Sequence, residues 1–252
     1  MVDIHSHILW GLDDGAETFE DSVEMIQMAA DGGTTDIVAT PHANHDYRFD
    51  PEVVEQRIAE LQKAVGSGRI QIHYGCDFHL MFENIEDALR EPKKYTINHG
   101  KYLMVEFADS VIPPNINDVF HNLRVSGIQS IITHPERNPA MQRSPQRLED
   151  FIQQGCFAQV TSQSLLGLFG KHAEQWGWKW MEQGLIHFVA SDAHEVRRRT
   201  PGLKEAYEVV AKKMGAPRAE QLFIANPGAV INSAPLPYRD FPVVKQKKWY
   251  QF

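Results

Sequence analysis

The sequence predicts an α/β protein, a distorted (β/α)7 barrel, on three observations. Short β-rich runs alternate with longer helical patterns about seven times in 252 residues. Such alternation is typical of parallel strands joined by right-handed helical crossovers. Barrels of this kind often reach this length as one domain. Histidines and carboxylates also follow strand after strand, which fits the rim of a barrel. An open doubly wound sheet is the structural alternative.

The expected strands are short apolar runs rich in β-branched residues, and the segments between them have helical spacing. Proline at a first helical position marks two helix starts, at Pro51 and Pro145. Glycines such as Gly127 and Gly184 follow a helix and precede a strand, where a C-terminal glycine belongs. Strands are expected at 2–5, 36–40, 70–74, 102–107, 130–134, 157–161 and 186–191, and helices at 19–31, 51–65, 115–126, 145–154, 172–184 and 202–214.

Composition narrows the class of protein. The 25 basic and 33 acidic residues give a formal net charge of −8, and an acidic chain has no general attraction for nucleic acid. The N-terminus resembles neither a signal peptide nor a membrane anchor, so membrane insertion is not expected. Two cysteines, Cys76 and Cys156, are too few for a disulfide framework, which fits a cytoplasmic protein. A domain is expected at 1–232, followed by a proline-rich, basic and aromatic tail at 233–252.

Metal-binding side chains lie at the C-terminal ends of six expected strands. His5 and His7 flank the end of the first strand, and the two-residue period of a strand points both to the same side. Strand ends of this kind converge on one rim of a βα barrel. A nitrogen and oxygen ligand set without cysteine suits Zn²⁺, Mn²⁺ or Fe, and several carboxylates favour a cluster of ions. The further candidate ligands are His42, Asp77, Glu106, His134, Asp192 and His194.

Each of these residues also has a simpler interpretation. A single histidine near a strand end is more often hydrogen-bonded than bound to a metal, and only the repetition at successive strands favours ligands. Asp13-Asp14-Gly15 is a common turn sequence, but its place at the same rim makes one aspartate a candidate ligand. His45 and His79 lie near the rim as candidate contacts outside the ligand set. The other histidines, His73, His99, His121, His172 and His187, are expected to be structural or solvated.

Two basic segments meet the same rim. Arg137 lies just past His134, and three adjacent arginines that end at Arg199 follow His194. An arginine at a carboxylate-rich metal site favours a phosphate that contacts both. Cysteine-based phosphoester hydrolysis is excluded by spacing, because neither cysteine is followed six residues later by an arginine. The residues therefore predict a metal-dependent hydrolase of phosphoesters.

With these residues assembled, the chain resembles the PHP (polymerase and histidinol phosphatase) superfamily from Met1 to about Val230. The opening DIHSHILWGLDDG (3–15) and ASDAH (190–194) are specific to that superfamily. THPERN (133–138), LFIANP (222–227) and the DDG of the first motif are similar to one branch of it. That branch comprises the bacterial manganese-dependent protein-tyrosine phosphatases encoded with capsule and exopolysaccharide genes.

The resemblance implies a distorted (β/α)7 barrel of the PHP type with three metal ions at its mouth, manganese first and iron or zinc as alternatives. It implies Arg137 and Arg199 as phosphate-binding arginines. It further implies a phosphotyrosine protein as partner, namely the tyrosine-rich tail of a bacterial kinase that controls polysaccharide export. The ligands that it implies are His5, His7, Asp14, His42, Asp77, Glu106, His134, Asp192 and His194.

One residue departs from the family pattern, and the substrate is not fixed by the motifs. The family usually has glutamate where this chain has Asp77, so the spacing of the metals at that bridge is open. A histidinol-phosphatase-like enzyme for a small phosphorylated metabolite would use the same metals. The same residues are compatible with a metal-dependent hydrolase of another bond and with a catalytically silent scaffold. A homo-oligomer is left open, and no general acid is assigned.

Overall fold

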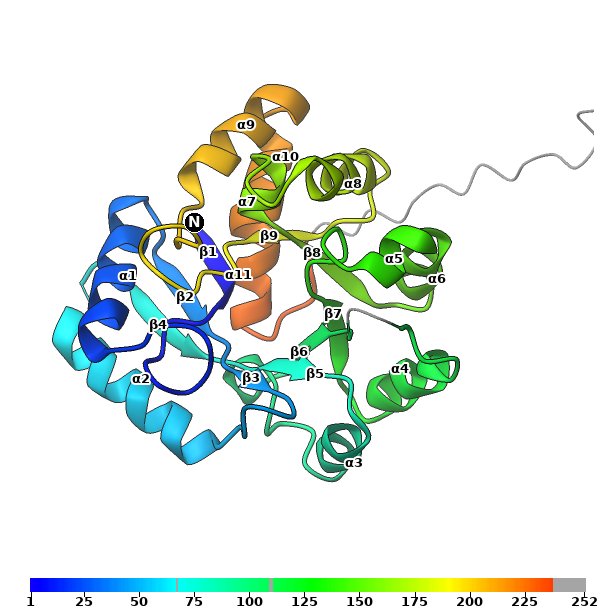
Figure 1. Ribbon diagram of the computed structural model, residues 1–252, viewed down its shortest axis with the longest axis horizontal. Coiled ribbons are helices and arrows are strands. Elements are labelled where there is room, and N and C mark those ends of the chain that lie inside the picture. The colour runs from blue at the N-terminus through cyan, green and yellow to red at the C-terminus, as the bar shows by residue number, and fades with distance from the viewer. Residues whose placement is uncertain (67, 109–110, 238–252) are drawn as a thin grey trace, which may run out of the picture.

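Short strands, each parallel to its neighbours, form a three-stranded and a six-stranded sheet that curl together in the computed structural model, which describes residues 1–66, 68–108 and 111–237 (Figure 1). The seven expected strands are present, and two short strands that were not expected, β3 and β5, follow the second and the third. The strands are β1 (Val2–Ser6), β2 (Asp36–Ala39), β3 (His42–Ala43), β4 (Gln71–Tyr74), β5 (Asp77–His79), β6 (Tyr102–Glu106), β7 (Gln129–Ile132), β8 (Phe157–Thr161) and β9 (Phe188–Ala190).

Local features separate the two additional strands from the expected ones. Pro41 separates β2 from β3, because proline has no N–H for the ladder, and its carbonyl accepts a bond from the Asp77 N–H at 3.1 Å. Gly75 lies between β4 and β5, where the neighbouring strand comes very close. A Cβ at Gly75 would lie 2.7 Å from Cγ1 of Val38. The strand order is β1-β2-β4 in one part of the sheet and β3-β5-β6-β7-β8-β9 in the other.

The sheet closes between its first and last strands. Ser6 forms a parallel bridge with Ala193. The Asp192 N–H donates to the His5 carbonyl at 2.8 Å, and the His7 N–H donates to the Ala193 carbonyl at 2.8 Å. The predicted distorted barrel is therefore confirmed, and the open doubly wound alternative is wrong. The closure also brings the end of β9 against the end of β1, where several candidate ligands lie.

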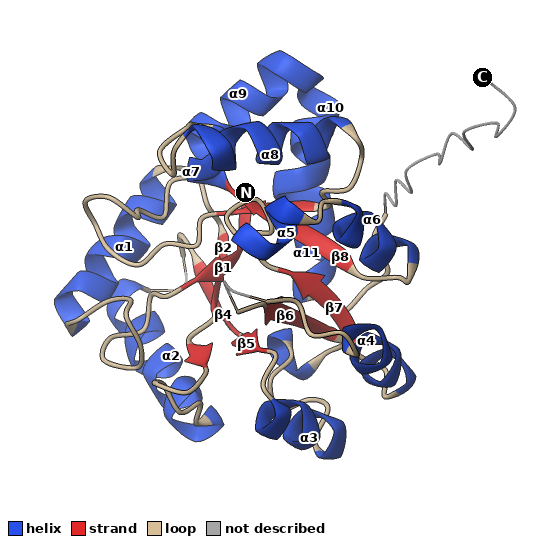
Figure 2. Cartoon of the chain, turned by 45° about the vertical axis from the view of Figure 1, so that its right-hand side comes forward, coloured by secondary structure: helices blue, strands red, loops and turns tan. Residues whose placement is uncertain are grey.

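Helices surround the curled sheet (Figures 1 and 2). The six expected helices are present with ends within three residues of the expected bounds; one shift is at Pro145, which precedes the first residue of its helix. These are α1 (Phe19–Asp31), α2 (Pro51–Val65), α4 (Ile116–Val125), α6 (Gln146–Gln153), α8 (Lys171–Glu182) and α9 (Lys204–Met214).

Further helical segments lie where the pattern predicted none. Pro217 and Pro227 argue against a helix after α9, yet Pro217 lies in the first turn of a new segment, where the N–H that it lacks has no partner within the helix. Pro227 lies where the π-type turn η2 runs into α11. The additional segments are α3 (Phe82–Arg90), the 3₁₀ turn η1 (Ile97–His99), α5 (Pro139–Arg143), α7 (Ser162–Leu165), α10 (Ala216–Glu220), the π-type turn η2 (Gln221–Ala225) and α11 (Asn226–Ile231).

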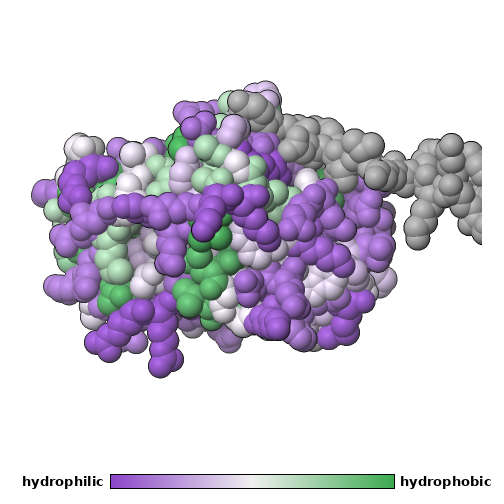
Figure 3. All heavy atoms as spheres, turned by 90° about the horizontal axis from the view of Figure 1, so that it is seen from above, coloured by the Kyte–Doolittle hydropathy of each residue, from purple (hydrophilic) through white to green (hydrophobic). Residues whose placement is uncertain are grey.

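Two apolar clusters hold these layers together. Along β6, Leu103 and Val105 belong to the larger cluster, whereas Tyr102 and Met104 belong to a smaller one. The smaller cluster includes Val230 of α11, a helix that lies against the middle of the curl (Figure 1). Alternation of side chains along a strand thus divides the core in two. The face drawn in Figure 3 is mostly hydrophilic, with apolar residues gathered in a narrow band.

The first residues of the expected tail are packed on the barrel. The Lys101 N–H donates to Ser233 Oγ at 3.1 Å, and the Tyr102 hydroxyl donates to the Ala234 carbonyl at 2.6 Å. The rest of the tail, from Tyr238 on, lies outside the described residues, and the division at residue 232 stays a prediction. In the described part of the chain, every helix is too short or too polar to cross a membrane.

Candidate metal centre

All nine expected ligands lie at one end of the sheet, close to one another. Their donor atoms form four overlapping groups, and within each group the atoms lie within 4.8 Å of one another. His5, His7, His42 and Asp77 each belong to two groups, so the groups form one cluster. The groups are His7, Asp14, His42 and His194; His42, Asp77, His79 and Glu106; His5, Asp77 and His134; and His5, His7 and Asp192.

The backbone is strained where two of these side chains enter the cluster. His134 follows β7 with φ of 28°, and Asp192 follows β9 with φ of 51°. Residues other than glycine seldom adopt such values, which cost of order 1–3 kcal/mol each and gather at functional sites. The strand ends therefore turn sharply to aim the His134 imidazole and the Asp192 carboxylate inward.

The geometry around His5 and His7 fits a bound cation. His5 Nδ1 donates to Gln159 Oε1 at 3.1 Å, and His7 Nδ1 donates to Asp13 Oδ2 at 2.6 Å. These bonds leave the two Nε2 atoms facing each other at 3.3 Å, and Oδ1 of Asp192 lies 3.6 and 3.5 Å from them. Two ligand atoms on one tetrahedral zinc-like ion lie about 3.4 Å apart, so this triangle has the size of a metal site.

Several buried ligand atoms that lack good hydrogen bonds also indicate a metal site. Among the described residues, both carboxylate oxygens of Asp77, Nδ1 of His42 and Oε2 of Glu106 are buried without a hydrogen bond of good geometry, although imidazoles lie close to the carboxylates. An unsatisfied buried polar group costs about 1–3 kcal/mol, and a divalent ion would satisfy all of these at once. The side chains present thus fit a cluster of divalent metal ions.

Asp77, the departure from the family pattern, still reaches two donor groups. Its side chain is fully buried, and Oδ2 lies 3.5 Å from His5 Nε2 and 3.2 Å from His42 Nδ1. The shorter aspartate therefore occupies a bridging position between the two groups. Burial raises the pKa of this carboxylate, but His5 and His42 more than compensate, so the pKa is well below its usual range and the group is charged.

His79 lies inside the cluster, although it was expected only as a contact outside the ligand set. Its Nε2 lies 2.5 Å from Oε2 of Glu106. The signal that could have found it is its spacing, because His79 follows Asp77 by two residues on β5, as His7 follows His5. His45, the other candidate near the rim, is exposed and lies outside the four groups.

Asp13 and Asp14 have different places, which the turn sequence left open. Asp14 Oδ1 lies 3.3 Å from His42 Nε2 and 3.5 Å from His194 Nε2, in the ligand cluster. Asp13 instead lies behind His7, and its carboxylate also accepts a hydrogen bond from the backbone N–H of His42 at 3.0 Å. A carboxylate behind a histidine fixes the tautomer and the ring orientation of a metal ligand.

Replacing Asp13 with alanine is expected to weaken metal binding about 10- to 100-fold, as loss of such a partner generally does. The cause is that His7 loses the group that holds its ring and keeps the proton on Nδ1. Metal affinity measured by competition with a coloured chelator checks this. Asp21→Ala, at the exposed cap of α1, is the control, and equal affinity in Asp13→Ala and wild type would contradict the assignment.

The carboxylates of the cluster favour protonated histidines in the metal-free protein. Burial alone would lower the pKa of His5, but Asp192 and Asp77 outweigh it and raise the pKa to about 9. Burial also disfavours a charged His42, whereas Asp14 and Asp77 raise its pKa to about 11. A histidine must be neutral to bind a metal, so protons and metal ions compete for these rings.

Metal affinity is therefore expected to fall as the pH falls below about 11, the pKa of His42, and more steeply below about 9, the pKa of His5. Below each pKa the metal-free protein holds a proton on that ring, and binding must release it. Each displaced proton lowers the affinity about tenfold per pH unit. Chelator competition at about pH 8.5 and about pH 6.5 measures the slope. A pH-independent affinity would show that these imidazoles are not displaced ligands.

The two expected phosphate-binding arginines converge on the edge of this cluster. Arg199 Nη2 lies 2.8 Å from Oδ2 of Asp192, and Arg137 Nη1 contacts the same oxygen. Their side chains are 24% exposed for Arg137 and 27% for Arg199, so both border the cluster and the solvent. A guanidinium offers paired N–H donors that match phosphate oxygens. Arg197 and Arg198 are exposed instead.

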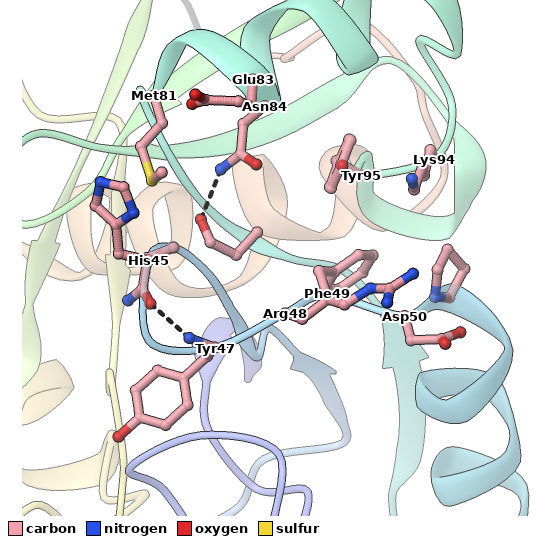
Figure 4. Close-up of a pocket in the computed structure, with 13 residues that line it drawn as sticks. His45, Tyr47, Arg48, Phe49, Asp50, Met81, Glu83, Asn84, Lys94 and Tyr95 are labelled. Atoms are coloured by element: carbon pink, nitrogen blue, oxygen red, sulfur yellow. Dashed lines mark hydrogen bonds between the residues drawn. The ribbon is translucent and has the colours of Figure 1, made fainter.

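Hollows surround the cluster at the surface. One of about 620 Å³ is lined by Asp14, His194 and Arg198, and the side chain of Asp14 is 49% exposed. A second, of about 470 Å³, lies beyond His42 and contains His45 and Arg48 (Figure 4). In it, Asn84 Nδ2 donates to the Ala43 carbonyl at 2.8 Å (Figure 4). The first hollow thus gives the cluster a mouth to the solvent, at Asp14 and His194.

The cysteines take no part in the site. Cys76 and Cys156 are both buried and unpaired. Burial raises the pKa of the Cys76 thiol well above its usual value, and that of Cys156 to about 12. Only a thiolate is a good nucleophile, so this result agrees with the exclusion of a cysteine mechanism.

Comparisons with known proteins identify the family of the chain. The family model described as capsular polysaccharide synthesis, CpsB/CapC, matches residues 1–232. The tyrosine-protein phosphatase YwqE of Bacillus subtilis is 36% identical over 219 residues, which cover 86% of each chain. The tyrosine-protein phosphatase CpsB of Streptococcus agalactiae is 31% identical over 241 residues, 92% of this chain and 99% of the relative.

Solved structures show the same architecture. One crystal structure from work on YwqE of Bacillus subtilis and CpsB of Streptococcus pneumoniae, described as unique metal-dependent tyrosine phosphatases, superposes with a TM-score of 0.90. It is 33% identical, and the match covers 96% of this chain and 98% of the other. The lactonase Lmo2620 of Listeria monocytogenes shares the fold at a TM-score of 0.58 and 16% identity, over 91% of this chain and 94% of the other.

Proposed function

We propose that the cluster of nine ligands and the two arginines described above hydrolyse phosphotyrosine. The chain belongs to the capsular polysaccharide synthesis CpsB/CapC family and is a metal-dependent tyrosine-protein phosphatase. The observation that carries the proposal is the pair Arg137 and Arg199, which meet Asp192 at the edge of the cluster. Phosphoryl oxygens bound there would contact both guanidinium groups and adjoin the metal ligands.

The ligand set would hold three divalent ions, manganese first and iron or zinc as alternatives. The proposal rests on the family resemblance and on the four donor groups that share His5, His7, His42 and Asp77. When bound, such ions act as Lewis acids and supply a nucleophilic water at neutral pH. The buried carboxylate oxygens of Asp77 and Glu106, which lack hydrogen bonds of good geometry, are the groups that would neutralise their charge.

The residues of the chain orient the substrate. Arg137 and Arg199 would bind the non-bridging phosphoryl oxygens and stabilise the charge that builds up on them as the bond to tyrosine breaks. A tyrosine oxygen has a pKa of about 10, so it leaves with less help from an acid than an alkyl alcohol needs. Asp13 and Gln159 hold His7 and His5 in the orientation that ligation requires.

The mouth suits a tyrosine within a protein segment. Asp14 is half exposed at the edge of a surface hollow of about 620 Å³, so a chain that carries a phosphotyrosine could pass across the rim. We propose the tyrosine-rich tail of a bacterial kinase that controls polysaccharide export as the substrate, and the cytoplasm as the location. Homo-oligomer formation is a further proposal, which only a measurement of mass in solution addresses.

Activity on a phosphotyrosine peptide and on histidinol phosphate, measured side by side with metal-loaded protein, tests the function. Activity confined to the peptide and lost on adding a chelator is expected. A preference for histidinol phosphate would overturn the protein substrate while leaving the metal chemistry intact. Activity on neither compound, with the metals bound, would overturn the assignment as a phosphatase.

A further inference from the structure

Phe169 contacts both arginines at the mouth. The centroid of its ring lies 4.3 Å from Cζ of Arg137 and 5.9 Å from Cζ of Arg199. A guanidinium within about 6 Å of an aromatic ring is attracted to the negative face of the ring. Asp192 and Phe169 are thus neighbours that Arg137 and Arg199 have in common.

Phe169 does not serve the core of the protein. Its side chain is half-buried, and in the described part of the chain it belongs to neither apolar cluster, nor to the apolar residues packed against them. Its neighbour Leu168 is 66% exposed. A phenylalanine placed for packing alone would be expected among the buried apolar side chains. The Phe169 ring instead lies against two guanidinium groups.

The turn that carries Phe169 is firmly built. Gly167 and Gly170 flank it with φ of 78° and 87°, values that glycine adopts without strain. The Leu168 N–H donates to the Gln163 carbonyl at 3.0 Å, and the Gly170 N–H donates to the Gly167 carbonyl at 3.0 Å. These bonds and glycines therefore fix the backbone from which the Phe169 ring projects.

Helix α7, just before this turn, is tied to both arginine segments. Ser164 Oγ donates to Oε1 of Glu136, the residue before Arg137, at 2.7 Å. Gln163 Nε2 donates to the carbonyl of Arg198, the residue before Arg199, at 2.7 Å. The short segment from α7 to Gly170 thus joins the two arginine loops and then places one ring against both guanidinium groups.

This ring would matter most when the metal ions are bound. Asp192, the acidic neighbour of both arginines, is a candidate metal ligand, and a cation beside it would weaken its attraction for them. The face of Phe169 carries no net charge and competes for no metal. It therefore gives both side chains a fixed surface that does not depend on the state of the carboxylate.

We propose that Phe169 is a positioning residue that holds Arg137 and Arg199 in place for a phosphoryl group. The inference rests on the proposed function, because it takes the arginines as the phosphate-binding groups. Phe169 would act through the arginines and need not touch the reacting atoms. Its removal should weaken phosphate binding and leave the metals in place.

The test is calorimetric titration of metal-loaded protein with inorganic phosphate. Phe169→Leu and Phe169→Met, which keep apolar bulk and lose the aromatic face, are expected to bind phosphate about 3- to 30-fold more weakly, the range that cation–π contacts span. Phe169→Tyr keeps the face and is expected to stay within about twofold of wild type. Leu168→Ala is the matched control, with unchanged binding.

Two further measurements separate positioning from folding. Metal content and the midpoint of thermal unfolding should be the same in Phe169→Leu as in wild type. In a background that lacks both guanidinium groups, Arg137→Ala with Arg199→Ala, the effect of Phe169→Leu on phosphate affinity should vanish, because residues that act through one another are not additive. A merely structural role would leave that effect in place.

Wild-type affinity in Phe169→Leu, or an equal effect with and without the arginines, would overturn the inference. The inference would also be overturned if Phe169→Leu lost enough metal or stability to explain its weaker phosphate binding and Phe169→Tyr showed the same loss. Failure of the proposed function looks different. The protein would then bind phosphate with the expected pattern of variants, yet hydrolyse no phosphotyrosine.

Discussion

Asp192→Asn is expected to lower the turnover of a phosphotyrosine peptide by about 10³-fold or more, because the metal ions supply several kcal/mol of stabilisation to the transition state. Asp192 is buried and joins the ligand cluster to the two arginines. Its Oδ1 lies within 3.6 Å of the Nε2 atoms of His5 and His7, and its Oδ2 contacts both Arg137 and Arg199. The amide removes the negative charge that both the ions and the guanidinium groups require.

The measurement is kcat for the peptide together with metal content per chain. The variant is expected to bind fewer ions than wild type, because Asp192 loses its charge in the group that it forms with His5 and His7. Asp31→Asn is the control, because the Asp31 side chain is 70% exposed and pairs with Arg69 at the surface. Full activity in Asp192→Asn with all metals bound would remove this aspartate from the site.

Arg137→Ala should lower kcat/KM for the same peptide by about 10²- to 10³-fold, as loss of one donor to a developing negative charge generally does. The guanidinium is mostly enclosed between Asp192 and Phe169, where its charge is little screened by water. Burial would lower its pKa, but Asp192 and Glu136 raise it above the usual value, so the group is cationic at any working pH. Lysine would restore the charge without the paired donors and should recover little activity.

Metal content distinguishes this result from that of Asp192→Asn, because Arg137→Ala should keep every ion. Removing the positive charge of Arg137 from the edge of the cluster reduces its repulsion of the metal ions and so does not weaken metal binding. Arg69→Ala is the matched control, since the Arg69 side chain is 62% exposed and pairs with Asp31 outside the site. Unchanged kcat/KM in Arg137→Ala would show that the phosphoryl group binds elsewhere on the rim.

Much of the fold and of the candidate site could be predicted from the sequence. The period of apolar residues placed the strands and six helices, because burial on a sheet or a helix face imposes that period. The same period put His5 and His7 on one side of one strand. The resemblance to the capsule-locus tyrosine phosphatases is confirmed by the family model and the relatives. That the nine residues bind metal stays a prediction, which their proximity supports.

Some features of the site depended on distances between strands, which no local pattern contains. Asp13 and Asp14 are adjacent in one turn, yet one lies behind His7 and the other faces His42 and His194. Only the packing of β1 against its neighbours separates these places. His79 likewise gains its position from Glu106 on the adjacent strand β6.

Local patterns along the chain were enough to establish seven strands and six helices in order, the candidate ligands at the strand ends and the family. Which donors meet depends on tertiary packing, because the closure between Ser6 and Ala193 brings the first and last strands of the barrel together. The same packing lays the ring of Phe169 against Arg137 and Arg199, which come from two other loops. Side chains far apart in sequence meet only when the whole sheet closes.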